Sequence, residues 1–125
     1  MMVCANSVTQ WGGVAVMSES RDWFKDKLTE YDRRRKLWMQ TLDEIGLPYG
    51  EPQGAYYIFI DIRPTGLTSQ EFVTRARSEA RLVFQPGTIG GGAGEGFIRG
   101  ALTKGSPEFE EGLERFKSFV SGLLS

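Results

Sequence analysis

Residues 82–103 read LVFQPGTIGGGAGEGFIRGALT, in which two short apolar runs flank a loop that contains six glycines. The runs, residues 82–84 and 97–102, are rich in residues that favour β-strands, so we expect two strands here. Arg99 stands in the middle of the second run. A buried guanidinium without a partner is very costly, which predicts an anionic partner for it. Our hypothesis is that this anion is the carboxylate of a small substrate.

Alternation along the second strand places residues 97, 99 and 101 on one face and residues 98, 100 and 102 on the other. Two ordinary explanations of Arg99 remain open at this point. Its guanidinium could form a local ion pair, for instance with Glu95, or it could stand at the solvated end of an edge strand. The residues alone favour these explanations over a functional role.

The glycine loop lacks the spacing of a phosphate-binding loop. It contains neither Gly-x-Gly-x-x-Gly nor Gly-x-x-x-x-Gly-Lys-Ser/Thr. It also leads into a strand, whereas phosphate-binding loops use the N–H groups at the start of a helix. Composition therefore predicts a mobile or tightly turned connection, and we expect the two strands around it to be antiparallel neighbours.

The composition is that of one ordinary globular domain. The 125 residues are 40% hydrophobic and 25% charged, with a formal net charge of −1. That charge gives no long-range attraction to nucleic acid or to a membrane, and no apolar run approaches the ~20 residues that span a bilayer. The first residues lack a signal-peptide pattern and Cys4 is the single cysteine, so we expect a cytoplasmic protein without a disulfide.

Histidine is absent from the sequence. Its absence removes histidine-based catalytic triads and nearly all zinc sites that one chain could make. We therefore assign no catalytic residue and no metal ligand to this chain. If the protein belongs to an enzyme, its catalytic base comes from elsewhere.

Two amphipathic patterns predict helices. In residues 21–45 apolar side chains recur at spacings of four and three, with Arg35 in one place of the stripe, and Gly46 and Pro48 follow as a stop signal. A similar pattern runs to the C-terminus after Ser106 as N-cap. The stripes are Phe24, Leu28, Tyr31, Trp38, Leu42 and Ile45 in the first helix, and Phe109, Leu113, Phe116, Val120 and Leu123 in the second.

Two shorter helices are predicted from capping boxes. Residues 68–71 (Thr-Ser-Gln-Glu) begin one whose inner face would include Phe72. Residues 7–10 (Ser-Val-Thr-Gln) begin another, in which Gly12 and Gly13 lower the helix propensity. For this second helix, a frayed terminal segment is an equal alternative.

Residues 54–62 (Gly-Ala-Tyr-Tyr-Ile-Phe-Ile-Asp-Ile) are almost continuously apolar, which predicts a central strand covered on both faces. The basic run 33–36 points in four directions around its helix, so we expect a solvated, salt-bridged surface there. Together the predicted elements give an α/β fold of the α+β type. It is a small, mostly antiparallel three-stranded sheet with helices packed chiefly on one side.

Residues 86–99 resemble the segment Pro-Gly-Ser-x-Phe-Gly-x-x-Gly-Glu-Gly-Tyr-Ile-Arg near the C-terminus of class I/II aminotransferases. These are pyridoxal-phosphate-dependent enzymes of fold type I, similar to aspartate aminotransferase. Residues 52–57 resemble the family's Pro-x-Gly-Ala-Phe-Tyr strand, residues 31–34 its Tyr-x-x-Arg-Arg-Asp helix segment, and residues 9–15 the helix before it. The positions of the first segment that match outright are Pro86, Gly87, Gly91, Gly94, Glu95, Gly96, Ile98 and Arg99.

The resemblance implies a role for Arg99. In that family the arginine at this position binds the α-carboxylate of the amino-acid substrate. A planar guanidinium suits the task, because it donates two parallel hydrogen bonds to a carboxylate and stays charged at every relevant pH. Two positions depart from the family, since Gly90 replaces an aromatic residue and Gly100 an aliphatic one. We expect both glycines to remove side-chain packing beside the substrate pocket.

The resemblance also implies what the chain lacks. The lysine that forms a Schiff base with pyridoxal phosphate lies upstream of the matching region in that family. The chain thus resembles a small C-terminal domain, residues 21–125, with residues 1–20 as a helix that would join it to a large domain. We expect this chain alone to bind no cofactor and not to transaminate. The lysines without a matching motif are Lys25, Lys27, Lys36, Lys104 and Lys117.

Other functions remain open. A domain of a pyridoxal-phosphate lyase of the same superfamily would look nearly the same. A non-enzymatic binding or interaction domain could have kept the fold, and Gly90 and Gly100 are its best support. The partners implied for the full enzyme are an amino acid or 2-oxo acid substrate and the missing large domain. Without that domain, apolar surface around Trp11 and Val14 would be exposed, so we expect self-association.

Overall fold

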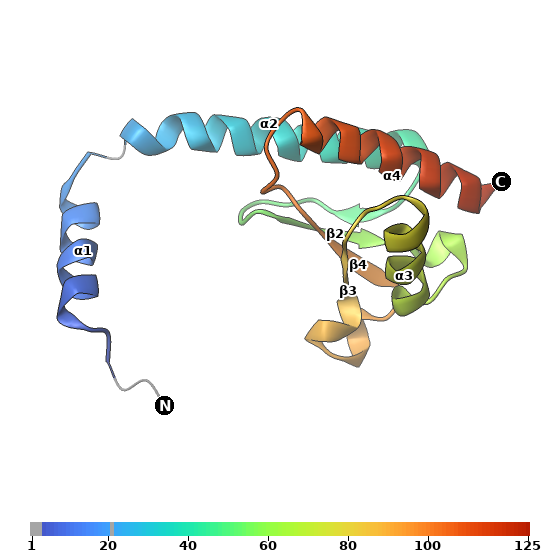
Figure 1. Ribbon diagram of the computed structural model, residues 1–125, viewed down its shortest axis with the longest axis horizontal. Coiled ribbons are helices and arrows are strands. Elements are labelled where there is room, and N and C mark those ends of the chain that lie inside the picture. Colours follow the sequence, from blue (N-terminus) through green and yellow to red (C-terminus); the bar gives the residue numbers. More distant parts are fainter. Residues whose placement is uncertain (1–3, 21) are drawn as a thin grey trace.

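The computed structural model describes residues 4–20 and 22–125, apart from the side chain of Trp23. Residues 1–3 of the expected joining helix, and Arg21 at the expected start of the second helix, lie outside the described residues. Figure 1 shows α2 and α4 side by side above the strands, with α1 standing away from them. The helices are α1 (Ser7–Ser18), α2 (Asp22–Ile45), α3 (Ser69–Glu79) and α4 (Glu108–Leu124), and the strands are β1 (Tyr49–Gly50), β2 (Tyr57–Asp61), β3 (Gln85–Pro86) and β4 (Phe97–Ala101).

The described sheet has four antiparallel strands in the order β1-β2-β4-β3, one strand more than predicted. The additional strand, β1, is two residues long, which is too short for a hydrophobic pattern to reveal it. The strands on either side of the glycine loop pair antiparallel, as predicted. However, β3 lies at Gln85–Pro86 and not at residues 82–84.

The end of α3 explains why β3 begins late. Arg81 adopts a left-handed conformation with φ of 56°, and the N–H of Leu82 donates to the carbonyl of Ala76 (3.0 Å). This backward hydrogen bond closes the C-terminal end of α3 and turns the chain away from the helix axis. Leu82 is therefore held against the helix, and the chain first pairs with β4 at Gln85, opposite Arg99.

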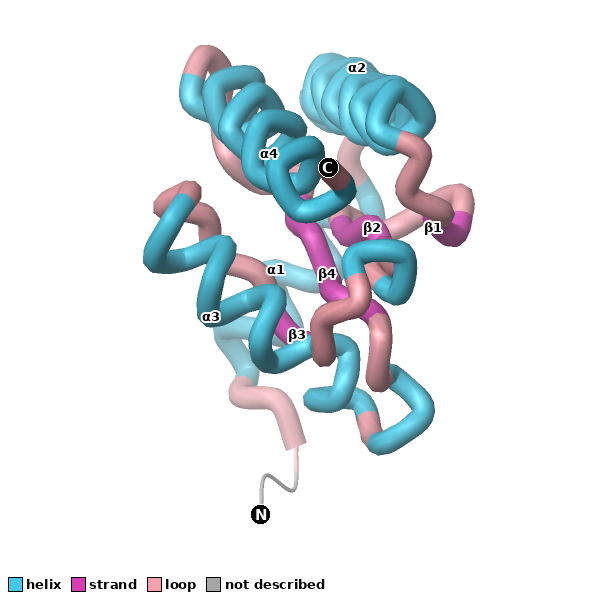
Figure 2. The backbone as a smooth tube through the Cα atoms, turned by 90° about the vertical axis from the view of Figure 1, so that its right-hand side faces the viewer, coloured by secondary structure: helices cyan, strands magenta, loops and turns pink. Residues whose placement is uncertain are grey.

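One face of the sheet carries the core. Ile58 and Ile60 of β2 and Ile98 of β4 are fully or almost fully buried, and Figure 2 shows α2, α3 and α4 gathered along one side of the strands. Aromatic rings fill the layer between helices and sheet. Trp38 of α2 meets Phe116 of α4 edge-on, with the ring centroids 5.0 Å apart, and such pairs contribute about 0.5–1.5 kcal/mol beyond the area they bury.

None of the described helices covers the other face of the sheet. Phe59 of β2 is 41% exposed, and Tyr57, Phe97 and Arg99 on the same face are half-buried. The prediction that β2 is covered on both faces is therefore wrong. Its apolar sequence suggested full burial, but Phe59 and Phe97 stack on each other at the surface, with centroids 5.1 Å apart.

Of the predicted helix starts, that at residues 68–71 is a complete capping box. The other two are displaced. Asn6 caps α1 in place of the predicted serine, with its Oδ1 accepting from the N–H of Thr9 (2.9 Å). The Ser106 hydroxyl donates to the carboxylate of Glu110 (2.8 Å) instead of accepting from the backbone of α4, because a charged acceptor within reach forms the stronger bond.

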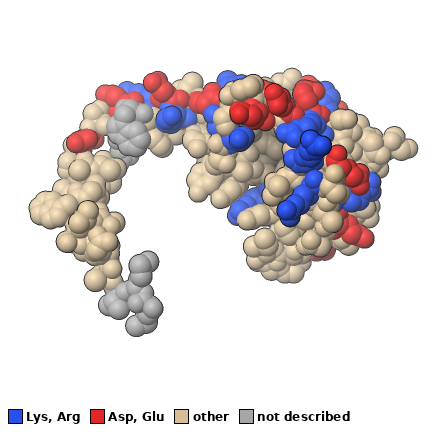
Figure 3. Space-filling view, viewed as in Figure 1, with Lys and Arg blue, Asp and Glu red and all other residues tan. Residues whose placement is uncertain are grey.

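The basic run 33–36 forms a salt-bridged surface, as predicted. Arg33 joins α2 to α4, because it donates to Glu30 (2.8 Å) and to Glu110 (2.7 Å). Arg34 also donates to Glu30 (2.8 Å), and Figure 3 shows charges of both signs intermingled along α2. Hydrogen bonds from Arg33 and then Arg34 lower the pKa of Glu30 to about 2.

This pairing makes part of the stability depend on pH. The pKa of Glu30 is about 2 in the folded chain and about 4.3 in an unfolded one. The pair therefore stabilises the fold above pH ~4.3 and loses its contribution as the pH falls toward ~2. We expect Glu30→Gln to lower the Tm at pH 7 and to match the wild type near pH 2. Thermal unfolding across this pH range measures the difference.

Glu19→Gln is the control for this prediction, because Glu19 is exposed and takes part in no ion pair of the described structure. Its Tm should follow that of the wild type at every pH. A difference between Glu30→Gln and the wild type that stays constant on acidification would contradict the assignment.

Candidate functional site

Arg99 lies in the middle of β4, on the uncovered face of the sheet. It is directly opposite Phe59 of β2 and Gln85 of β3, so it is flanked by a strand on each side. Burial alternates along β4, with Arg99 half-buried and its neighbours Ile98 and Gly100 fully buried. The predicted alternation is confirmed.

Within the described part of the chain, no carboxylate forms an ion pair with Arg99. Its guanidinium instead lies over the ring of Tyr57, with Cζ 3.9 Å from the ring centroid. Arg77, Arg81 and Arg115 also take part in no ion pair of the described structure, but they are exposed, so water solvates their charges. Arg99 is half-buried and has less water around it. Its charge is thus available to an anion from outside the described chain.

Glu95, the alternative partner considered for Arg99, is engaged elsewhere. Its Oε1 accepts a hydrogen bond from the N–H of Ser69 at the start of α3 (2.7 Å), where the helix dipole favours a carboxylate. The hydroxyl of Ser69, which is fully buried, in turn accepts from the N–H of Gly96 (2.9 Å). These two bonds tie the glycine loop to α3.

The glycine loop is a tightly turned connection, one of the two forms predicted. It contains two short 3₁₀ turns, at residues 87–90 and 92–94. Gly87 and Gly94 lie backbone against backbone, so a Cβ on either one would collide with the carbonyl oxygen of the other. Only glycine permits this approach at both positions. The loop therefore holds a compact shape beside Arg99.

An open hollow of about 390 Å³ lies between the loop and Arg99. Phe59, Ile89 and Ala93 give it apolar walls, and Gly90 lines it as well. Gly90 is exposed, and a Cβ added there would meet nothing within 4 Å. Its missing side chain therefore leaves space beside Arg99, as expected.

Gly100 has a different role from the one expected. It lies on the buried face of the sheet, where an added Cβ would be 3.1 Å from Cγ2 of Ile58 and 3.3 Å from Cζ2 of Trp38. The indole of Trp38 thus occupies the space that an aliphatic side chain at this position would need. The expectation that Gly100 removes packing beside the substrate pocket is wrong, because alternation places it on the opposite face from Arg99.

Arg63 also lies at the uncovered face, with its Cζ 5.2 Å from the centroid of the Phe97 ring. Unlike Arg99, it has a carboxylate partner, because its Nε donates to Asp61 (2.9 Å). The hydrogen bonds from Arg63 hold the pKa of Asp61 below its ordinary value. The charge of Arg63 is therefore balanced within the chain.

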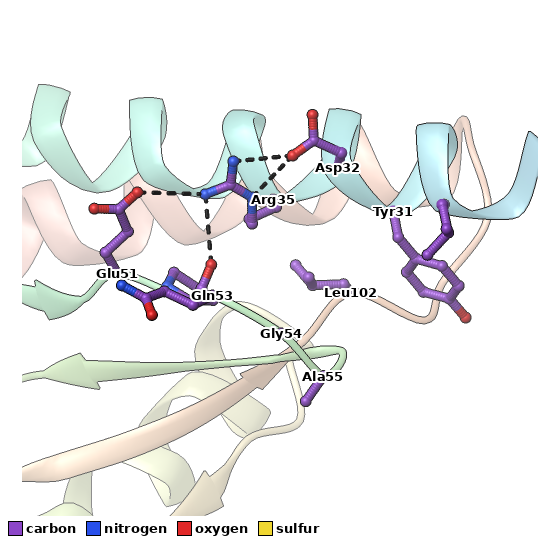
Figure 4. Close-up of a pocket in the computed structure, with 10 residues that line it drawn as sticks. Tyr31, Asp32, Arg35, Glu51, Gln53, Gly54, Ala55 and Leu102 are labelled. Carbon is purple, nitrogen blue, oxygen red and sulfur yellow. Dashed lines mark hydrogen bonds and ion pairs between the residues drawn. The ribbon is translucent and has the colours of Figure 1, made fainter. Parts of the chain in front are cut away.

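A second hollow, of about 400 Å³, lies between α2 and the loop that precedes β2 (Figure 4). Arg35 lies along it and donates to Asp32 (3.0 Å) and to the carbonyl of Pro52 (3.5 Å), with Glu51 3.6 Å from its Nη1. Arg35 thus fastens this loop to the helix, which explains a cation within the apolar stripe of α2. Because its charge is already balanced, we assign no anion site here.

The fold and the site together define a class of protein. The fold is a small antiparallel sheet with helices on one face, and the site on the other face is an arginine beside a glycine loop. Residues 1–116 match the family model for aminotransferases of class I and II. The chain therefore belongs to the class I and II aminotransferase family.

Comparison with individual proteins also places the chain in this family. The chain is 38% identical over 119 residues to an aspartate aminotransferase of Pyrococcus abyssi and 36% identical over 119 residues to aromatic-amino-acid aminotransferase 2 of Thermococcus litoralis. Each match covers 94% of this chain and 31% of the relative. The solved structure of an aromatic aminotransferase from Pyrococcus horikoshii OT3 matches with a TM-score of 0.83 and 39% identity, over 90% of this chain and 31% of that one. The chain thus spans less than a third of the length of these relatives.

The family implies pyridoxal phosphate in the parent enzyme, but the lysines of this chain do not fit a site for it. A lysine that forms a Schiff base needs a sheltered place that lowers its pKa. Lys25, Lys36 and Lys117 instead pair with carboxylates on helix surfaces, and the other two are exposed. The hydrogen bond to Glu44 raises the pKa of Lys117, which is the wrong direction for a nucleophile.

No helix among the described residues is long and apolar enough to cross a membrane. Residues 4–20 and 22–125 hold no group of three or more His, Cys, Asp or Glu side chains placed to bind a metal ion. Cys4 is a free, exposed thiol.

The tie between the glycine loop and α3 can be tested by removing one hydroxyl. Ser69→Ala leaves the buried N–H of Gly96 without its acceptor, which we expect to cost about 1–3 kcal/mol of unfolding free energy. Urea unfolding measures this loss, and hydrogen exchange at the Gly96 amide should become faster. The exposed Ser78 on α3 provides the control, because Ser78→Ala should change stability by less than about 0.5 kcal/mol. Equal stability of the two variants would show that the loop does not depend on Ser69.

Proposed function

We propose that this chain is the C-terminal domain of an aminotransferase and that Arg99 binds the α-carboxylate of an amino-acid or 2-oxo-acid substrate. The observation that carries the proposal is a half-buried guanidinium without a carboxylate partner among the described residues. It lies on the sheet face that no described helix covers. The matched relatives are about three times longer than this chain. In this proposal a large domain supplies the Schiff-base lysine and completes the cleft, so the chain alone does not transaminate.

The substrate side chain is not fixed by this chain. The relatives are named for aspartate, for aromatic amino acids and for LL-diaminopimelate. A lyase of the same superfamily would use Arg99 in the same way. The alternative of a non-enzymatic interaction domain rested on Gly90 and Gly100. Gly100 no longer supports it, because this residue packs in the core and does not line the hollow beside Arg99.

The single free thiol, Cys4, is consistent with a reducing compartment such as the cytoplasm.

Titration with pyruvate, the smallest 2-oxo acid, tests the role of Arg99. In the ¹⁵N-labelled chain, the Nε–H signal of Arg99 should shift on addition of pyruvate and not on addition of methyl pyruvate, which has no carboxylate. Arg99→Ala should weaken pyruvate binding about tenfold or more, because each charge-assisted hydrogen bond contributes about 1.5–3 kcal/mol.

Arg115→Ala is the matched control, since it removes an exposed arginine that has no ion pair in the described structure. It should leave pyruvate binding unchanged. Binding that survives Arg99→Ala, or that falls equally in Arg115→Ala, would reject the proposed role.

Helix α1 supports the proposal that another domain covers part of this chain. The helix contains no charged residue and buries none of its side chains, and Figure 3 shows it without charge on the visible face. Val8, Trp11 and Met17 are more than 70% exposed. A helix that is apolar all round is normally buried in a larger structure. We therefore assign α1 to the interface with the large domain.

Without that domain, the exposed helix should drive self-association, as the sequence predicts. The average mass measured by light scattering should rise with the concentration of the chain, and Trp11→Glu should reduce that rise. Val83→Glu is the control, because Val83 is 82% exposed but lies far from α1 in sequence, before β3. A wild-type chain that stays monomeric at high concentration, or equal effects of the two variants, would contradict the role given to α1.

A further inference from the structure

Arg99 and Tyr57 form the closest cation–ring contact in the described chain. The Cζ of Arg99 is 3.9 Å from the ring centroid, compared with 5.2 Å for Arg63 over Phe97 and at least 5.6 Å for the contacts of Arg34. Carbon atoms in van der Waals contact are about 3.5–4.0 Å apart. The guanidinium carbon of Arg99 therefore touches the face of the ring.

The strand register produces this contact. Tyr57 is directly opposite Ala101, and Arg99 is its diagonal neighbour on the same face. Because Ala101 has a small side chain, it does not cover the ring, and the longer side chain of Arg99 reaches across to it. Tyr57 also packs against Tyr56, with ring centroids 4.6 Å apart. The ring thus contacts both a neighbouring ring and the guanidinium.

A guanidinium that stacks on a ring keeps its N–H groups in its own plane, directed away from the ring. No described residue accepts a hydrogen bond from Arg99, and none of its nitrogen atoms is buried without a partner. The ring therefore holds the cation by its flat face and leaves the donor edge open. In Arg63 that edge is occupied by Asp61.

We propose that Tyr57 is a positioning residue for Arg99. Its ring fixes the plane of the guanidinium on the uncovered face of the sheet, so that the donor edge meets the incoming carboxylate with both hydrogen bonds aligned. This role rests on the proposed function of Arg99 as a carboxylate ligand. Tyr57 acts through its ring and not through its hydroxyl, because the ring face makes the contact.

Three variants of the chain test this role. Tyr57→Leu removes the ring and keeps an apolar side chain, whereas Tyr57→Phe keeps the ring and removes the hydroxyl. Ala101→Leu leaves Tyr57 and Arg99 intact but fills the space through which Arg99 reaches the ring. We expect Tyr57→Leu and Ala101→Leu to weaken pyruvate binding about threefold to tenfold, and Tyr57→Phe to change it by less than about twofold.

A second measurement does not depend on binding. The side-chain protons of Arg99 lie over an aromatic ring, so their NMR signals should be shifted upfield in the wild type and in Tyr57→Phe. In Tyr57→Leu and Ala101→Leu these signals should return to the positions of an exposed arginine. If Tyr57 were merely structural, its replacement would lower the Tm, but the loss of the upfield shift and the loss of affinity for pyruvate would not occur together across the variants.

The outcomes separate the two proposals. Equal pyruvate binding by the wild type, Tyr57→Leu and Ala101→Leu would reject the positioning role and leave the role of Arg99 standing. A loss in Tyr57→Phe as large as that in Tyr57→Leu would also reject it, because the hydroxyl would then be the active group. If Tyr57→Leu does not fold, pyruvate binding by Ala101→Leu alone tests the positioning role. No shift of the Arg99 signal with pyruvate in the wild type would reject both roles.

Discussion

The packing of Trp38 against the sheet determines which face of the sheet is buried. The indole lies edge-on to Phe116 and fills the space above Gly100, where any side chain would be within 3.3 Å of it. Because side chains alternate along a strand, a buried Gly100 requires that Arg99 point to the opposite face. The exposure of the arginine is therefore a consequence of the core. Gly100, one of the two positions that depart from the family pattern, therefore belongs to this core.

The described arginines other than Arg99 either pair with a carboxylate or are exposed to water. Arg33, Arg34, Arg35 and Arg63 have carboxylate partners within the chain. The pair of Arg33 with Glu110 joins α2 to α4 and that of Arg35 with Glu51 fastens the loop before β2, whereas the pairs of Arg34 and Arg63 are local. Arg99 is half-buried and is held by an aromatic ring instead. An ion pair neutralises a cation, whereas a ring orients it without removing its charge. This difference is the reason that we propose Arg99, and neither Arg35 nor Arg63, as the ligand of an external carboxylate.

The helices and the face of Arg99 could be predicted from the sequence, because apolar spacing and strand alternation are local properties. The late start of β3 could not be predicted, because it depends on the hydrogen bond that the N–H of Leu82 donates to Ala76 near the end of α3. Nor could the contact of Arg99 with Tyr57, since it depends on the register between two strands that are distant in sequence. The role of Glu95 was missed for the same reason, because its partner Ser69 lies on another element. Long-range register is the information that pattern and composition do not contain.

The central claim is that Arg99 binds the carboxylate end of a substrate in a cleft that a second domain completes. A crystal structure tests it most directly, using a chimera in which this chain replaces the matching 31% of the Pyrococcus abyssi aspartate aminotransferase, with a 2-oxo acid bound. We expect both carboxylate oxygens to lie about 2.7–2.9 Å from two nitrogen atoms of Arg99, with the guanidinium still over Tyr57. A carboxylate bound elsewhere, with Arg99 paired to an acidic side chain of the large domain, would contradict the claim.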